Sequence, residues 1–205
     1  MKEQLQKDFD NIIKNLSLSQ RDTEIKQFYL DNFINKGFPN RRDENWKFSD
    51  LNQIIKKNIG ELSFYNDYTS TNKVDTSVFV DGLEHNKIVF INGRIEKIDF
   101  DYEKKDQIEI IDKSENINKF NNNNSLSDLN NAFTNKSFKI VVKNGYQLVK
   151  PLIIYHTTNS KIWSKNINLR LDFELEKDST LRLIDLFNDT SEKNFLNIFY
   201  NFNLK

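Results

Sequence analysis

The sequence predicts an α+β protein in which helices come first and strands follow. The opening segment, Met1 to about Leu16, repeats apolar residues at helical spacing, whereas from Lys87 onward apolar and polar residues alternate with period two. A length of 205 residues with 37% hydrophobic and 13% aromatic content suffices for one sizeable core or two small ones. A chain that is disordered throughout is therefore disfavoured.

Two helices are expected at the start of the chain. The first spans Met1 to about Leu16, and the second spans about Thr23 to Lys36. Gly37 can adopt the left-handed conformation that ends a helix, and Pro39 cannot continue one because it lacks a backbone donor. The apolar stripes of the two helices contain Leu5, Phe9, Ile12, Ile13, Leu16, Ile25, Phe28, Tyr29 and Phe33.

A third, short helix should follow. Ser49 or Asp50 can accept a hydrogen bond from its first free backbone amides, and Gly60 marks its end. Its shared apolar face contains Leu51, Ile54, Ile55 and Ile59. The next stretch, Ser63 to Ser77, has weak periodicity and many polar residues, so it is predicted to be a loop.

The middle of the chain predicts a hairpin, a strand and one more helix. Ile88 to Ile91 and Arg94 to Ile98 flank Asn92-Gly93, a pair that tolerates the positive φ angles of a two-residue turn. Ile108 to Ile111 is expected to form a short strand. Leu126, Leu129 and Phe133 recur at helical spacing and indicate a helix in SLSDLNNAF.

Beyond this helix only strands are expected. Pro151 belongs at the start of a strand or at a corner, because proline cannot donate a ladder hydrogen bond. The chain stops within an alternating segment, NFNLK, which suggests a fragment with an uncovered sheet edge. Asn is abundant, and we interpret this as coding bias without functional content. The alternating apolar positions are Phe138, Ile140 and Val142, then Ile167, Leu169, Leu171, Phe173 and Leu175, and finally Ile198, Tyr200, Phe202 and Leu204.

Charge and cysteine content limit the function. Thirty basic and thirty acidic residues cancel, so long-range attraction to nucleic acid or to an anionic membrane is not expected. With no cysteine, the chain has neither disulfides nor thiolate ligands. No apolar run approaches the length of a signal peptide core or a bilayer span, which favours a cytoplasmic location. Glycine-rich phosphate-binding loops are absent as well, so ATP hydrolysis is disfavoured.

Few side chains are candidates for chemistry. His85 lies in a polar, turn-like segment and His156 follows an apolar run; neither has a second ligand at metal spacing, so both are interpreted as surface or hydrogen-bonded histidines. Asp172, Glu174 and Glu176 share one strand face and could serve glycoside hydrolysis, which makes a carbohydrate-active enzyme one alternative. Their alternation with apolar residues favours a solvated face instead. A generic interaction module is the other alternative.

The most specific stretch is Gly37 to Leu51, GFPNRRDENWKFSDL. Arg41, Arg42, Asp43, Glu44 and Lys47 surround two aromatic residues, so opposite charges are expected to pair while the rings seek cover. The order resembles the pattern G-hydrophobic-P-x-R-(K/R)-x-E-x-W-(K/R)-aromatic-(S/T)-D-L of the SufB/SufD family, the scaffold subunits of SUF iron–sulfur cluster assembly, and is most similar to SufD.

Three further segments match that family: IVFINGRI, SLSDLNNAF and GYQLVKPLIIYHTT. The resemblance covers nearly all of this chain but only the N-terminal half of the family. It implies a helical domain over residues 1–86, a hairpin and connecting segment over 87–125, and the first coils of a right-handed parallel β-helix over 126–205, truncated at the end. Short strands separated by corners fit such a solenoid, and an antiparallel sandwich is the structural alternative.

The resemblance also implies a function. The chain would be a non-enzymatic scaffold that works with a SufB-like subunit and a SufC-like ATPase, without a cofactor of its own. The family's cluster-building residues lie in its later strands, so no catalytic, cofactor-binding or metal-binding residue is assigned here. The part that docks the ATPase would also lie beyond this chain.

Overall fold

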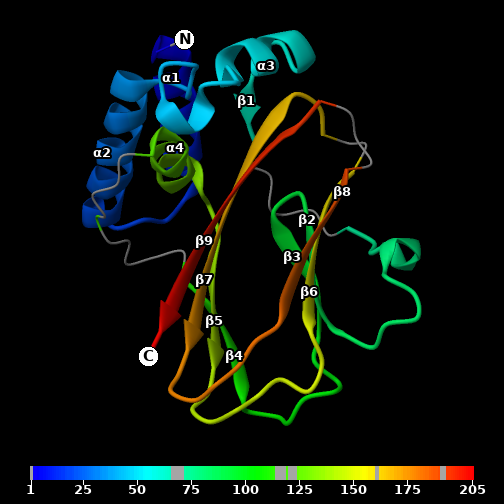
Figure 1. Ribbon diagram of the computed structural model, residues 1–205. Helices are drawn as coiled ribbons and strands as arrows, with labels where there is room; N and C mark the ends of the chain where they lie inside the picture. The colour runs from blue at the N-terminus through cyan, green and yellow to red at the C-terminus, as the bar shows by residue number, and fades with distance from the viewer. Residues whose placement is uncertain (1, 66–71, 114–118, 120–123, 160–161, 190–192) are drawn as a thin grey trace.

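The computed structural model describes residues 2–65, 72–113, 119, 124–159, 162–189 and 193–205. It has a mixed α+β architecture, with a helical layer at one end and two sheets that extend away from it (Figure 1). The helices are α1 (Lys2–Asn15), α2 (Gln20–Lys36), α3 (Leu51–Asn58) and α4 (Ser125–Phe133), with short 3-10 turns η1 (Glu44–Trp46) and η2 (Thr76–Val78). In the described part of the chain, none of these helices combines the length and the apolar character that crossing a bilayer requires.

The strands are β1 (Ser63–Phe64), β2 (Asn86–Ile91), β3 (Arg94–Asp99), β4 (Ile108–Asp112), β5 (Ser137–Val142), β6 (Leu152–Thr158), β7 (Lys165–Leu175), β8 (Leu183–Asp189) and β9 (Phe195–Leu204). All four predicted helices and every predicted strand are confirmed. The predicted loop Ser63–Ser77 is wrong at its ends, where β1 and the start of η2 lie, and its middle falls outside the described residues.

Capping residues set the helix boundaries. α2 begins three residues before the predicted Thr23, because Ser19 Oγ accepts a hydrogen bond from the backbone N–H of Asp22 at 3.1 Å. Of the two candidates for the cap of α3, Asp50 is the one used, and its carboxylate accepts from the N–H of Gln53 at 3.1 Å.

Helices distant in sequence share one aromatic core. Phe133 of α4 stacks on Phe64 of β1, with 3.6 Å between ring centroids, and meets Phe9 of α1 edge-on at 6.0 Å. Tyr29 and Phe33 of α2 are fully buried in the same cluster. After β4 the chain thus returns to the helical layer, where α4 completes this aromatic core.

The two sheets are built from alternating strands. Sheet A has the order β4-β5-β7-β9, with β1 also paired to β7, and sheet B has the order β3-β2-β6-β8. From β5 to β9, consecutive strands alternate between the two sheets, and β7, β8 and β9 each pair in parallel with the strand two before them. β6 also pairs in parallel with β2. The antiparallel sandwich considered from sequence is therefore wrong.

Inward-facing apolar side chains fill the space between the sheets. Ile88, Phe90, Ile154 and Phe173 are each at most 1% exposed there. The residue that no sequence pattern anticipated is Asp185, which stands at an inward position of β8. It interrupts the apolar alternation of that strand, which explains why β8 was not predicted.

The β2–β3 turn confirms the predicted hairpin. Asn92 and Gly93 have φ angles of 53° and 78°, as a type I′ turn requires. A bulge between Val89 and Phe90 adds an irregularity to the pairing of these strands. The predicted place of Pro151 is also confirmed, because β6 begins at the next residue.

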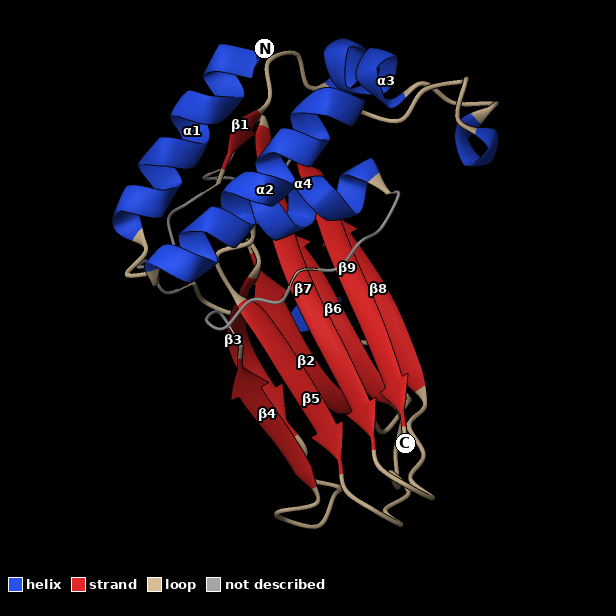
Figure 2. Cartoon of the chain, turned by 90° about the vertical axis from the view of Figure 1, so that its left-hand side faces the viewer, coloured by secondary structure: helices blue, strands red, loops and turns tan. Residues whose placement is uncertain are grey.

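Asparagine side chains join the helical layer to sheet A, over the part of the sheet that the helices cover in Figure 2. Asn130 of α4 donates to the carbonyl oxygens of Leu169 and Asn197, at 3.0 and 2.7 Å. Asn197 in turn donates to the carbonyl of Leu126 and to Oδ1 of Asn168. These asparagines have a structural role, since their amides satisfy buried backbone carbonyls.

Candidate functional site

Three polar side chains meet between the two sheets. His156 of β6 places its Nε2 2.9 Å from Oδ1 of Asp185 on β8 and 2.9 Å from the hydroxyl of Tyr200 on β9. The strand alternation that points Ile154 and Phe173 inward also points these side chains inward, although they are polar. This cluster brings three titratable side chains together between the sheets.

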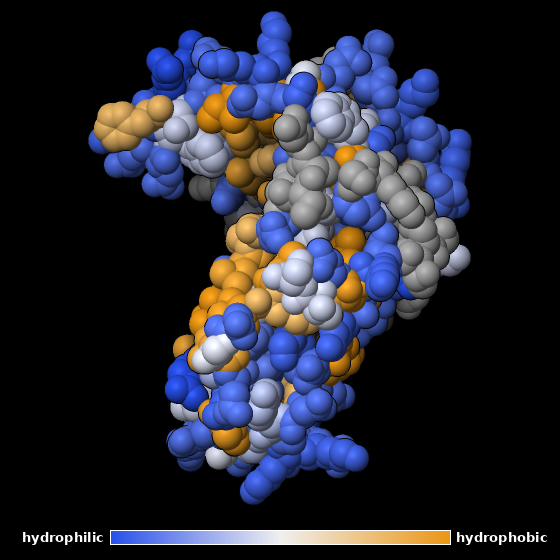
Figure 3. All heavy atoms as spheres, turned by 90° about the vertical axis from the view of Figure 1, so that its right-hand side faces the viewer, coloured by the Kyte–Doolittle hydropathy of each residue, from blue (hydrophilic) through white to orange (hydrophobic). Residues whose placement is uncertain are grey.

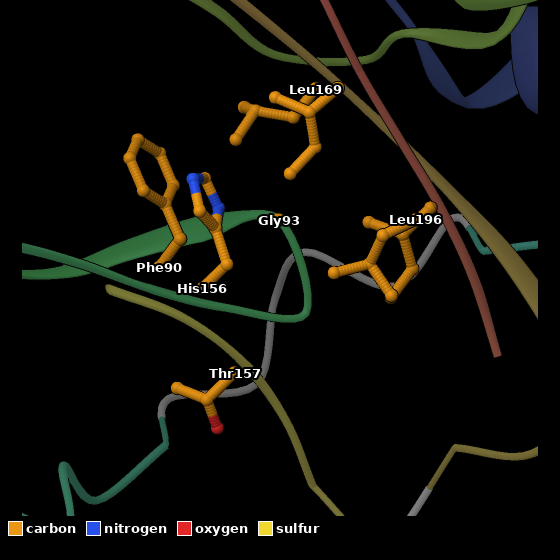
Figure 4. Close-up of a pocket in the computed structure, with 8 residues that line it drawn as sticks. Phe90, Gly93, His156, Thr157, Leu169 and Leu196 are labelled. Atoms are coloured by element: carbon orange, nitrogen blue, oxygen red, sulfur yellow. The ribbon is translucent and has the colours of Figure 1, made fainter. Parts of the chain in front are cut away.

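Aromatic rings surround the imidazole. Phe90 stacks on His156 with 5.4 Å between ring centroids, and Phe187 stacks on it at 5.0 Å. Figure 4 shows the rings of Phe90 and His156 side by side and directed toward Leu169, whereas Thr157 points the opposite way. The imidazole, which is 3% exposed, is therefore held in one orientation by its neighbours on both sides.

The electrostatics keep the phenol of Tyr200 protonated. Burial raises its pKa well above the usual value of 10, and the nearby Asp185 carboxylate raises it further. A protonated hydroxyl can donate a hydrogen bond, and the carboxylate of Asp185 can accept one. His156 Nε2 faces the same carboxylate.

The space beside the cluster is small on one side and larger on the other. Toward Phe90, Gly93 and Leu169 the cavity holds about 10 Å³, room for one water at most (Figure 4). Toward β8 and the start of β9 it holds about 240 Å³. The larger cavity is lined by His156, Thr158, Phe187, Asn188, Asn194 and Leu196.

Hydroxyl and imidazole groups line the two cavities. His156 lines both, Thr157 lines the smaller one and Thr158 the larger one, and the described lining residues include no serine, cysteine or lysine. Among the residues with a described position, no three His, Cys, Asp or Glu side chains come close enough together to hold a metal ion. The arrangement can therefore orient rings and hold three polar side chains together between the sheets.

In the other histidine, His85, both ring nitrogens have a hydrogen-bond partner. It is 2% exposed, its Nδ1 lies 2.6 Å from the carbonyl oxygen of Leu83, and its Nε2 lies 2.7 Å from the hydroxyl of Tyr155. That hydroxyl also accepts from the backbone N–H of Val80 at 3.0 Å. Both histidines are thus hydrogen-bonded core residues, one of the two interpretations that the sequence left open, and neither is a surface residue.

The three carboxylates of the glycosidase alternative are engaged in structural contacts. Glu174 contacts Lys139 at 2.6 Å and Lys205 at 2.7 Å, and hydrogen bonds from these two lysines lower its pKa to about 2. Asp172 pairs with Arg170 at 3.1 Å. The prediction that Glu176 lies on the same strand is wrong, because β7 ends one residue earlier. Glu174 is therefore held in its ionised form, which does not suit the role of general acid in glycoside hydrolysis.

The first residues of segment 37–51 pack against the rest of the fold. Phe38 is buried and meets Phe33 of α2 and Phe195 of β9 edge-on, at 5.0 and 6.3 Å. Gly37 ends α2 with a φ of 73°, as predicted. These residues attach the segment to the helical core and to the start of β9.

The charged half of the same segment, Arg41 to Lys47, does not form the contacts predicted from the sequence. Among the described residues, no ion pair joins its charged side chains, all of which are exposed. Trp46 packs partly against the helical core, but Phe48 is 86% exposed and has only Lys47 over its ring, at 4.8 Å. The expected charge pairing and burial of Phe48 are therefore wrong, and these side chains face solvent.

The sequence analysis missed the contacts of one buried charged residue, Lys26, and of one partly buried charged residue, Glu103. Lys26 of α2 directs Nζ at the carbonyl oxygens of Asn131 and Thr134, at 3.2 and 2.6 Å, and so caps the end of α4. Glu103 accepts from the hydroxyl of Tyr146 at 2.6 Å and from two backbone amides of the corner before β6. Each partner lies more than forty positions away in the sequence, so no local pattern could have identified either contact.

Comparison with protein-family models and with curated proteins finds no match for this chain.

Proposed function

We propose that this chain is a non-enzymatic scaffold of the SufB/SufD type, most like SufD, which serves iron–sulfur cluster assembly in the cytoplasm. On this proposal residues 126–205 are the first coils of a right-handed parallel β-helix, and the helices before them form the family's N-terminal domain. The partners are a SufB-like subunit and a SufC-like ATPase.

One observation carries the proposal. From β5 to β9 consecutive strands alternate between two sheets, and β7, β8 and β9 each pair in parallel with the strand two before them. Successive coils of a two-sided solenoid stack in this way, because each coil can bury its apolar face only against its neighbours. The strand order thus agrees with the expectation drawn from the resemblance.

The polar chemistry supports a scaffold over an enzyme. His85, His156 and Glu174 are all occupied by contacts within the fold. In contrast, the charged half of segment 37–51 and Phe48 make few contacts within the fold. Exposed aromatic and charged side chains of this kind suit recognition of a protein partner.

Co-purification tests the proposal. The affinity-tagged product of the intact native gene should retain a SufB-like subunit and a SufC-like ATPase from its own host. If it retains neither, the proposal fails.

A pair of variants tests the role of segment 37–51. Phe48→Ala should weaken capture of the SufB-like subunit, because it removes an exposed ring that the fold does not use. Trp163→Ala is the control, since Trp163 is another large exposed aromatic residue, 54% exposed, that lies elsewhere in the sequence. Equal capture by Phe48→Ala and the native protein would remove this segment from the interface.

A further inference from the structure

A segment that contains no strand covers part of the outer face of sheet B. Residues 72–85, which we call the strap, include η2 and lead into β2. Figure 1 shows η2 on the side of sheet B that faces away from sheet A, and Figure 3 looks onto this side, where hydrophilic side chains cover much of the surface. Apolar side chains join the strap to the sheet: Val74, Val78 and Phe79 of the strap, and Val89, Ile91, Ile153 and Tyr155 of β2 and β6.

The strap is attached through side chains and not through a ladder of backbone hydrogen bonds. All of its residues are described, and none of them belongs to a strand. A cavity of about 290 Å³ lies between its first half and the sheet, and Val78, Val89 and Ile91 are among the residues that line it. Segments with few contacts open at a lower free energy than the strands they cover. The strap can therefore leave the sheet without unfolding it.

His85 and Tyr155 hold the second half of the strap. Nδ1 of His85 lies 2.6 Å from the carbonyl oxygen of Leu83, which can only accept, so Nδ1 carries the ring proton. Nε2 is then an acceptor, and the hydroxyl of Tyr155 donates to it at 2.7 Å. The same hydroxyl accepts from the backbone N–H of Val80 at 3.0 Å. Neutral His85 thus fixes the hydroxyl that holds the strap backbone.

A second proton on the imidazole is incompatible with this arrangement. Nε2–H would then point at the hydroxyl of Tyr155, and the proton of that hydroxyl would lose its acceptor. Within the described part of the chain, the hydroxyl has only the two partners named above. The new charge would also be buried, because His85 is 2% exposed and the adjacent Glu84 pairs with Lys150 at 2.7 Å. Burial of an unpaired charge is unfavourable.

The carboxylates around His85 remain ionised where a histidine titrates, which is near pH 6.5 for an ordinary side chain. Those on the elements that meet at His85 and have a pKa below its usual value are Asp75, Glu84, Asp99 and Glu103. Hydrogen bonds from Ser77 and Lys150 are the main cause for the first two. For the other two, burial raises the pKa, but hydrogen bonds outweigh it. The other charged groups there are Lys73, Asp81, Lys87, Lys97 and Lys150.

We propose that the strap is an acid-sensitive latch: protonation of His85 releases residues 72–80 from sheet B and uncovers the apolar outer face of β2 and β6. The open form binds a proton that the closed form excludes, so acid favours opening. For an exposed histidine, the opening constant rises about tenfold from pH 7.5 to 5.5. The site lies within sheet B, where β6 has a neighbour on each side, and the inference does not depend on the proposed function.

Hydrogen exchange of the Val80 amide, followed by NMR on the intact chain, tests the latch without any variant. Its protection factor, which corrects for the intrinsic effect of pH on exchange, should fall about tenfold from pH 7.5 to 5.5. Amides of β2 that pair with β6 should keep their protection. An unchanged protection factor at Val80 would overturn the proposal. An equal loss in the β2–β6 ladder would also overturn it, because acid would then loosen the whole sheet.

Three variants identify the group that responds. His85→Gln offers Tyr155 an amide oxygen as acceptor but cannot be protonated, so protection at Val80 should not fall in acid. Tyr155→Phe removes the acceptor of the Val80 N–H, so protection should be low at both pH values. His156→Gln is the matched control, because it removes the only other histidine and should retain the tenfold fall. Acid sensitivity that persists in His85→Gln, or disappears in His156→Gln, would contradict the role of His85.

Discussion

Replacing Lys26 by Met should remove a rise of stability with pH. Burial lowers the pKa of Lys26 from its usual 10.5 to about 7, although the nearby Asp22 opposes the decrease. Between these two pH values the unfolded chain holds a proton that the folded chain has released. The unfolded state then binds more protons, so the free energy of unfolding increases with pH in this window.

The magnitude follows from the two pKa values. Each pH unit within the window should add at most about 1.4 kcal/mol to the stability of the native chain. From pH 7.5 to 9.5 the gain from Lys26 alone should thus reach about 2–3 kcal/mol. Lys26→Met lacks this gain, and it leaves the carbonyl oxygens of Asn131 and Thr134 without their buried donor. The variant should therefore fall progressively further below the native chain as pH rises.

Urea denaturation followed by circular dichroism at several pH values from 7 to 9.5 measures this difference. Keeping below pH 10 avoids the ionisation of tyrosines in the unfolded chain. Lys7→Met, at an exposed position of α1, controls for the loss of a lysine. Two parallel stability curves for the native chain and Lys26→Met would refute the reasoning, because they would mean that Lys26 titrates alike in the folded and unfolded states.

Three other substitutions test separate parts of the fold by urea denaturation. Burial disfavours the charged form of Glu103, but hydrogen bonds from Tyr146 and other donors outweigh this effect and lower its pKa. The stabilisation that ionised Glu103 provides is therefore complete above about pH 4.5 and is lost on further acidification. Glu103→Gln should lower the free energy of unfolding by about 1–3 kcal/mol at neutral pH and should reduce the loss of stability in acid. Phe133→Ala should lose about 3–5 kcal/mol, since it empties the centre of the helical core. Gly93→Ala should lose at least about 1 kcal/mol, because a Cβ there would lie 2.8 Å from Ile167 Cγ2 at a φ of 78°. A loss below about 0.5 kcal/mol in any of the three would contradict the contact assigned to it.

Local patterns predicted most of the secondary structure because they depend on residues close in sequence. Helical spacing identified α4, and Asn92-Gly93 identified the β2–β3 turn. Local patterns did not predict β8. Asp185 occupies an inward position of this strand, and its contacts with His156 and Tyr200 explain why a charged residue stands there. A charged residue at such a position removes the alternation on which strand prediction depends.

By itself the sequence determined the order of helices and strands, the helix-ending residues and the apolar positions that face the core. Only the tertiary structure decided that strands alternate between two sheets, that His156 meets Asp185 and Tyr200, and that Asn130 and Lys26 join elements far apart in the chain. The physical reason is one of range. Periodicity and capping act within one or two turns of backbone, whereas a buried polar group is satisfied by whichever partner the folded chain brings within about 3 Å of it.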